Sequence, residues 1–235
     1  MQATSVQAGQ GWGWYACGWR LFAKNPIIWI VLIVITGLIT IALSLIPIVG
    51  PLAAGLIMPV LGGGLMLGAH RLDQGESLEI ANLFQGFQDK TRFTPLITLG
   101  IIFLVAEIII GLVGVGLVGG PMIGQFMATQ DPASVSFGIG SLFGIFVILV
   151  FAAALAMAFI YAVPLVMLQG GAPIAAIKSS FDGSLKNIAP LFIFGILYIV
   201  FAIVAAIPFG LGFLVLFPWA TCSVYCSYKS IFQSQ

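Results

Sequence analysis

The sequence predicts an all-α protein: a polytopic transmembrane helical bundle of about six spans. Apolar residues make up 61% of the chain and charged residues only 6%, against roughly 25% charged residues in soluble domains. The mean hydropathy is +1.19. All eight Lys and Arg residues fall in alternate gaps between the apolar runs. Because cationic loops stay on the cytoplasmic side of a membrane, this alternation predicts a multi-pass protein with both termini cytoplasmic.

A membrane-spanning helix needs about 20 mainly apolar residues. The expected spans lie near residues 26–48, 51–69, 95–118, 140–168, 190–208 and 209–227. Residues 1–25 form an N-terminal interfacial segment without the compact apolar stretch and cleavage site of a removable signal peptide. The whole chain, 1–235, is expected to form a single transmembrane domain.

Short Pro-containing and Gly-containing links join two pairs of these spans. Ile46–Pro51 connects the first pair and Ile207–Gly210 the last, so each pair is expected to form a tight helical hairpin. The third and fourth spans are joined by Pro121–Gly138, in which Asp131 is the only formal charge. This link is expected to be the one sizeable segment on the outer face.

Each hairpin is preceded by apolar residues at helical spacing, a pattern typical of helices that lie in the membrane interface with their rings turned inward. The three sets are Trp12, Tyr15, Trp19 and Phe22; Ile80, Leu83, Phe84 and Phe87; and Ile174, Ile177, Phe181 and Leu185. Trp12, Trp19, Phe84, Phe87 and Phe181 are the candidate interfacial anchors. The tryptophans could equally contact a partner.

This recurrence favours an internal repeat of three helical hairpins. Each unit consists of an amphipathic helix, a Lys, a Pro that opens a span, a turn, and a second span containing Pro59, Pro164 or Pro218. Chance similarity in so biased a composition is the alternative. The three prolines are expected to interrupt their spans because proline removes a helical hydrogen bond.

Glu107 is the only formal charge inside an expected span, close to the middle of the third. A carboxylate at such depth costs on the order of 3 kcal/mol, so it is expected to face the bundle or a wet cavity, or to be protonated. One interpretation is a proton or cation site, or a polar anchor for a partner helix. The other is a neutral acid bonded to a hydroxyl of a neighbouring span, with Thr40, Ser44, Tyr161 and Tyr198 as candidates.

The remaining candidates favour neither a cofactor nor a metal. A single histidine, His70, cannot build a site with histidine partners, and three cysteines with none expected outside predict no disulfide framework. Cys222 and Cys226 share a helix face, where packing is the simpler role. The glycines of Gly114–Gly119 match a dinucleotide fingerprint by letter only, because they end an apolar span. The net charge of +1 argues against nucleic acid.

Several short motifs resemble an uncharacterised family of small bacterial six-helix integral membrane proteins. They are Gly18–Pro26, Leu83–Phe87, Ser179–Phe181 with Asn187, and Tyr228–Phe232. More distantly, the chain is similar to the membrane region of some glycerophosphodiester phosphodiesterases, whose catalytic domain it lacks. The resemblance implies a six-helix membrane fold, a bacterial inner (cytoplasmic) membrane location and no catalytic residues.

Three classes of function follow. The first is a non-catalytic accessory, scaffold or assembly subunit whose partners are membrane lipid and other membrane protein subunits. The alternative is a transporter or channel for a small or lipid-like solute that uses Glu107, because Pro-interrupted and Gly-interrupted spans recur at substrate sites. A membrane enzyme ranks last because the acidic residues between 73 and 89 alternate with cations, as on a solvated face.

Overall fold

The computed structural model describes residues 2–130 and 138–233, and in this part of the chain the fold is all-α. Among these described residues, five helical segments are long and apolar enough to cross a membrane. They are Pro26–Ser44, Val49–Asp73, Lys90–Thr129, Ile139–Gln169 and Ile188–Ala206. This supports a multi-pass membrane protein and confirms the helical class. Asp131 lies outside the described residues.

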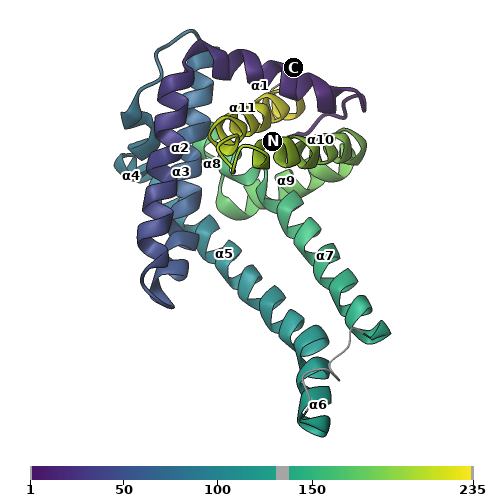
Figure 1. The fold of residues 1–235 in the computed structure, drawn as a ribbon. Coiled ribbons are helices and arrows are strands. Elements are labelled where there is room, and N and C mark those ends of the chain that lie inside the picture. The colour runs from purple at the N-terminus through teal and green to yellow at the C-terminus, as the bar shows by residue number, and fades with distance from the viewer. Residues whose placement is uncertain (1, 131–137, 234–235) are drawn as a thin grey trace.

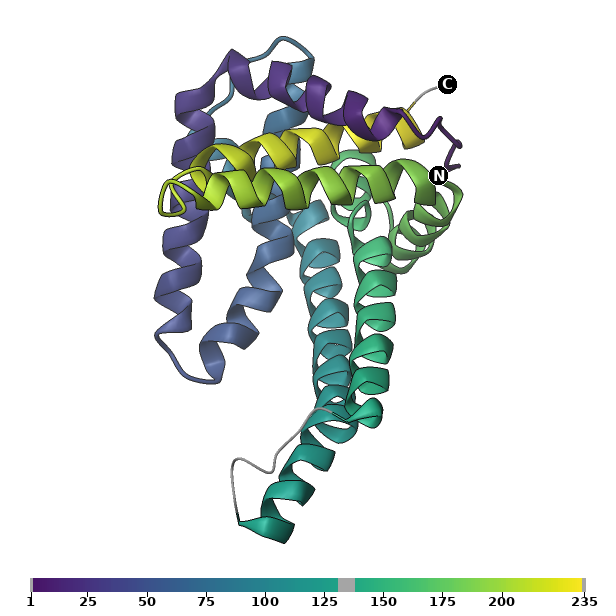
Figure 2. The ribbon, with the colours of Figure 1, turned by 45° about the vertical axis from the view of Figure 1, so that its right-hand side comes forward.

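The first hairpin follows a shorter helix that runs across its end (Figures 1 and 2). Helix α1 (Gln10–Lys24) ends just before Pro26, which occupies the first turn of α2 (Pro26–Ser44), where a missing N–H costs nothing. A tight turn leads into α3 (Val49–Asp73). Pro59 lies inside α3, which continues through it, so the expected interruption at Pro59 is wrong.

The second hairpin is the longest part of the molecule. A 3₁₀ turn, η1 (Ile80–Phe84), and one helical turn, α4 (Gln85–Gln88), precede α5 (Lys90–Gly114). The helix continues through a π-helical segment, η2 (Val115–Gly119), into α6 (Gly120–Thr129), and α7 (Ile139–Phe159) returns beside it. In Figure 2, α5 and α7 extend beyond the turn between α2 and α3, and α6 extends further still.

The helix that runs back along α5 is interrupted just before Pro164, as the sequence predicts. A proline ring clashes with the carbonyl four residues earlier, and α7 ends immediately before Ile160. A new helix, α8 (Ala162–Gln169), follows. The freed backbone groups are satisfied by α9 (Pro173–Lys186): the Tyr161 N–H donates to Ser180 Oγ at 3.0 Å, and Ser180 Oγ donates to the Met157 carbonyl at 2.8 Å.

The third hairpin departs from the expected arrangement of parallel spans. Helices α10 (Ile188–Ala206) and α11 (Phe213–Phe232) run across the ends of α5 and α7 rather than beside them (Figure 2). Their connecting turn lies beside α2, not at the end where α2 and α3 connect. Helix α11, the expected sixth span, is not among the helices apolar enough to cross a membrane. Pro218 lies inside it, so the expected interruption is wrong there too.

Helix α11 is less apolar because one face of it forms the core of the bundle. Its buried residues include Cys222, Ser223, Tyr225 and Tyr228. Helix α1 packs along it so closely that a Cβ on Gly18 would lie 2.8 Å from the Cα of Ser223. The sequence therefore places small and hydroxyl-bearing side chains, rather than bulky aliphatic ones, where these two helices meet.

The ends of the chain meet on the same side of the molecule (Figure 2). The Thr4 N–H donates to the Ile231 carbonyl at 2.9 Å, and the Val6 N–H donates to Asn187 Oδ1 at 2.8 Å. The eight cations belong to elements at this side: the end of α1, the end of α3, the start of α5, α9 and the end of α11. We call it the cation-bearing end.

Candidate functional site

Glu107 lies on the outside of α5 with its side chain exposed. Its neighbours Val105, Ile108 and Ile109 are also exposed, each by about half of its surface. Within residues 2–130 and 138–233, no hydrogen bond or ion pair joins Glu107 to another group, and Tyr198, a proposed partner, lies on a different hairpin. Glu107 does not face the bundle, because the α5–α7 hairpin buries few of its own residues, and the alternative that it is protonated stays a prediction.

The depth of Glu107 along its helix agrees with the sequence-based expectation. Leu104 contacts Gly55 of α3: a Cβ built on Gly55 would lie 2.7 Å from Leu104 Cδ1. Glu107 is almost one turn further along α5 and thus nearer the turn between α2 and α3. The continuous helix runs from Lys90 to Thr129, so Glu107 lies close to its middle.

The candidate anchors on α1 sit at the rim of its protein-packed face. Trp12 is 58% and Trp19 47% exposed, while Trp14, between them, is buried. The Trp12 ring lies 6.5 Å from Phe201 and the Trp19 ring 5.3 Å from Trp219. Both indoles therefore touch the α10–α11 hairpin and present their other surface outward, which suits a membrane interface or a partner.

The other three anchors are less exposed than Trp12 and Trp19. Phe84 is half-buried, Phe87 is 37% exposed and Phe181 is half-buried. On α9 the apolar stripe that contains Phe181 is not the packed face, because the buried residues are Ala176, Ser180, Gly183 and Ser184. The serines face the interrupted end of α7, whose backbone they satisfy, and the interfacial role of the stripe stays a prediction.

A polar network joins α3 to α11 at the cation-bearing end. Tyr225 Oη donates to Asp73 Oδ2 at 3.0 Å and lies 3.1 Å from Nδ1 of His70. Lys229 Nζ donates to the same Asp73 oxygen at 2.6 Å. Because Tyr225 is fully buried while Lys229 is half-exposed, the network leads from the packed helices to the surface. It was not predicted, since it unites residues 152 and 156 positions apart.

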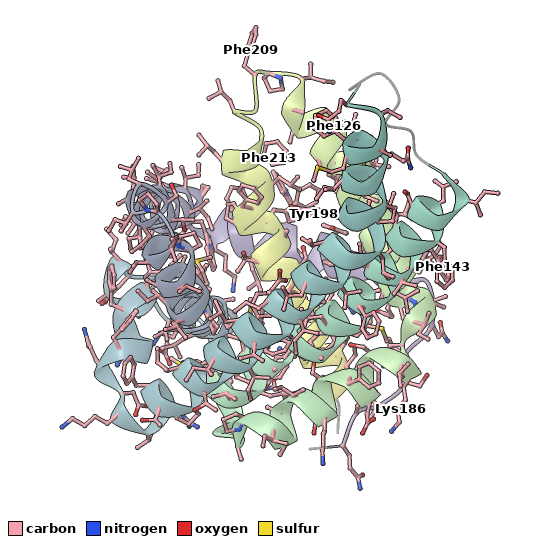
Figure 3. The ribbon with its side chains drawn as sticks, turned by 90° about the horizontal axis from the view of Figure 1, so that it is seen from below. Phe126, Phe143, Lys186, Tyr198, Phe209 and Phe213 are labelled. Carbon is pink, nitrogen blue, oxygen red and sulfur yellow. A yellow bond between two sulfur atoms is a disulfide. The ribbon has the colours of Figure 1, made fainter. Side chains whose placement is uncertain are left out.

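An apolar groove of about 800 Å³ lies between α2, α3 and α11. Ile33 and Ile41 mark its extent along α2, Met58 and Met66 along α3, and Phe213 stands on α11. Figure 3 shows Phe213 near the Phe209 end of that helix. A second, small cavity of about 30 Å³ lies between α5 and α7. Glu107 lines neither of the two.

The cysteines give a clear correction to the sequence-based expectation. Cys17 of α1 and Cys226 of α11 form a disulfide, with their Cα atoms 6.2 Å apart, while Cys222 is free and buried. The packing of α1 along α11 brings the two sulfurs together across 209 residues of sequence. Pairing of this kind follows from tertiary contact and leaves no signal in the local sequence.

The chain was compared with protein-family models, curated proteins and solved structures. No match was found in any of the three. The resemblance that the short motifs suggest therefore stays an expectation. The geometry of the molecule offers two separate features, the exposed carboxylate of α5 and the apolar groove beside α2.

Proposed function

We propose that this protein is a non-catalytic accessory or scaffold subunit that binds another membrane protein through the α5–α7 hairpin. The observation that carries the proposal is the outward-facing Glu107, which has no polar partner among the described residues. An ionisable group within a membrane span normally pairs with another polar group. A polar side chain from a second subunit would supply that pair.

The apolar residues around Glu107 do not by themselves indicate a partner, because lipid tails are as apolar as they are. The carboxylate is the anomaly. A hydrogen bond to a charged group contributes about 1.5–3 kcal/mol, so one contact at Glu107 is enough to change association by about tenfold or more.

The proposed setting is a bacterial inner membrane with both termini in the cytoplasm. The positive-inside rule supports this orientation, since the cations occur on elements of one end and the two termini meet there. We also propose that the three hairpins derive from one repeated unit, each following a shorter helix or turn. Because α10 and α11 run across the ends of α5 and α7, the third unit packs differently from the first two.

The test is purification in a gentle detergent, with mass spectrometry of everything that travels with the protein, for the wild type, Glu107→Gln and Glu76→Gln. Glu76 is a control because it is an exposed acid at the cation-bearing end, 3.7 Å from Arg71. We expect a stoichiometric protein partner in the wild type and the control, and about tenfold less of it with Glu107→Gln. A monodisperse wild-type monomer without crosslinks in native membranes would refute the proposal.

A transporter that uses Glu107 receives less support from the same geometry. Such a protein needs a cavity that reaches the carboxylate from the membrane interior, as transporter sites near the midplane do. Glu107 faces outward, and the large groove lies on the other side of α3 among residues of α2 and α11.

A further inference from the structure

The groove between α2, α3 and α11 has no polar group free to recognise a polar solute. Its three hydroxyls each donate to a carbonyl of their own helix: Thr36 to Leu32 at 2.8 Å, Thr40 to Thr36 at 2.9 Å, and Thr221 to Phe217 at 2.9 Å. Thr40 also donates to Met58 Sδ of α3 at 3.7 Å, so its contacts too are within the protein. The rest of the lining is aliphatic, aromatic, Met and Gly. An apolar occupant is therefore favoured, because any polar group entering the groove would lose its hydration without compensation.

The dimensions of the groove distinguish between two apolar occupants. Its edge on α2 runs from Ile33 to Ile41, which at 1.5 Å per residue is about 12 Å. A membrane-spanning partner helix that lay parallel to α2 would follow the full hydrocarbon thickness of about 30 Å and would extend well beyond the groove. One leaflet supplies about half of that depth, about 15 Å. The length of the groove therefore matches the acyl region of a single leaflet.

The two ends of the groove differ in polarity. Met66 and Thr221 line its end nearer the cations, and one helical turn further along the same two helices lie His70 and Tyr225 of the polar network. The network continues to Lys229, which is half-exposed. At the other end the lining is apolar, with Met58 and Ile41. An amphipathic molecule with its polar group toward the cation-bearing end fits this gradient.

We propose that the groove binds one acyl chain of a membrane phospholipid from the leaflet on the cation-bearing side. The chain lies against α2 under α11, and its headgroup lies beside the polar network that ends at Lys229. This site is separate from the Glu107 surface and does not depend on a partner protein.

Gly37 gives a selective way to fill the groove. A Cβ at Gly37 would meet no atom within 4 Å, so Gly37→Leu places an isobutyl group in the groove without a clash at its base. Gly195 of α10 is the matched control: it is exposed, its Cβ position is equally open, and it does not line the groove. Both changes replace glycine by leucine inside an apolar helix, which raises helix propensity equally.

The experiment measures phospholipid retained per protein after extensive washing in a maltoside detergent, by native mass spectrometry, with vesicles of phosphatidylethanolamine and phosphatidylglycerol as the lipid source. We expect about one retained phospholipid in the wild type and in Gly195→Leu, and at least a fivefold loss in Gly37→Leu. Circular dichroism of all three proteins checks that the helices remain.

Equal retention in all three proteins would overturn the proposal, as would a wild type that retains no lipid. A wild-type dimer that Gly37→Leu converts to monomer would show that the groove holds protein instead, and would also overturn it. Glu107→Gln separates this site from the proposed function, because that variant is expected to lose its protein partner and to keep the lipid.

Discussion

Gly18 offers the most direct test of how the bundle is held together. A Cβ at this position would lie 2.7 Å from the backbone nitrogen of Ser223 and 2.8 Å from its Cα, and it would also press on the Ser223 hydroxyl. These are backbone atoms of a packed helix, which cannot rotate away as a flexible side chain can. Gly18→Ala therefore forces α1 away from α11.

The magnitude follows from two opposing effects. Overpacking of a well-packed core costs about 1–3 kcal/mol, whereas replacing Gly by Ala inside a helix gains up to about 1 kcal/mol. Gly195→Ala has the second effect without the first, because nothing lies within 4 Å of its Cβ position. The difference in unfolding free energy between the two variants isolates the clash, and we expect Gly18→Ala to be about 1–3 kcal/mol less stable.

Unfolding in mixed micelles with increasing sodium dodecyl sulfate, followed by tryptophan fluorescence, measures this difference. Trp219 is a suitable reporter because its indole N–H donates to the Tyr15 carbonyl at 2.8 Å, directly across the α1–α11 contact. Equal stability of Gly18→Ala and Gly195→Ala would refute the inferred close approach of α1 and α11.

Two further predictions concern the ends of helices. The Asn187 side chain donates to the Thr4 carbonyl at 2.9 Å and accepts from the Val6 N–H at 2.8 Å, and Asn187→Ala removes both hydrogen bonds. Because each lost bond costs about 1 kcal/mol, we expect residues 2–9 to detach and to be cleaved by proteinase K. Unchanged cleavage would show that other contacts hold the segment. Hydrogen bonds from the hydroxyl and backbone N–H of Thr91 lower the pKa of Asp89 at the start of α5. A carboxyl group whose pKa is lowered in the folded state stabilises the protein above its unfolded-state pKa, and this stability is lost as the pH falls through its folded-state pKa. We therefore expect Asp89→Ala to be less stable than the wild type at pH 7. In acid, below both pKa values of the carboxyl group, the two proteins should be equally stable. A stability difference that persists in acid would contradict this.

Much of the fold could be predicted because its causes are local. Pro26 opens α2, and the links Ile46–Pro51 and Ile207–Gly210 make tight hairpins, as expected. Pro164 interrupts its span because its ring cannot fit the carbonyl of Ile160. Pro59 and Pro218 have the same local chemistry and yet lie inside continuous helices. Proline identifies a weak point in a helix, and the packing around it decides whether the helix is interrupted there.

The orientation of Glu107 and the groove, on which the proposals rest, were harder to predict because they depend on which face of a helix packs against which neighbouring helix. The sequence identified Glu107 as a charge within a span, but not that it points outward. The groove was missed altogether, since its walls come from three segments of ordinary apolar sequence. On α9 the apolar stripe was visible in the sequence. The hydrogen bonds of Ser180 and Ser184 to the Met157 carbonyl, and of the Tyr161 N–H to Ser180, which fix the packed face, were not.

The Cys17–Cys226 bond connects these questions of packing and topology. Disulfides are rare in the cytosol, and in the proposed topology this end of the molecule faces the cytosol. The contact of α1 with α11 does not depend on the bond, because Gly18 meets Ser223 and Trp219 bonds the Tyr15 carbonyl beside it. The helices therefore hold the two sulfur atoms together in either redox state. In a reducing compartment the same packing would hold two neighbouring thiols, so the bond and the proposed topology are compatible.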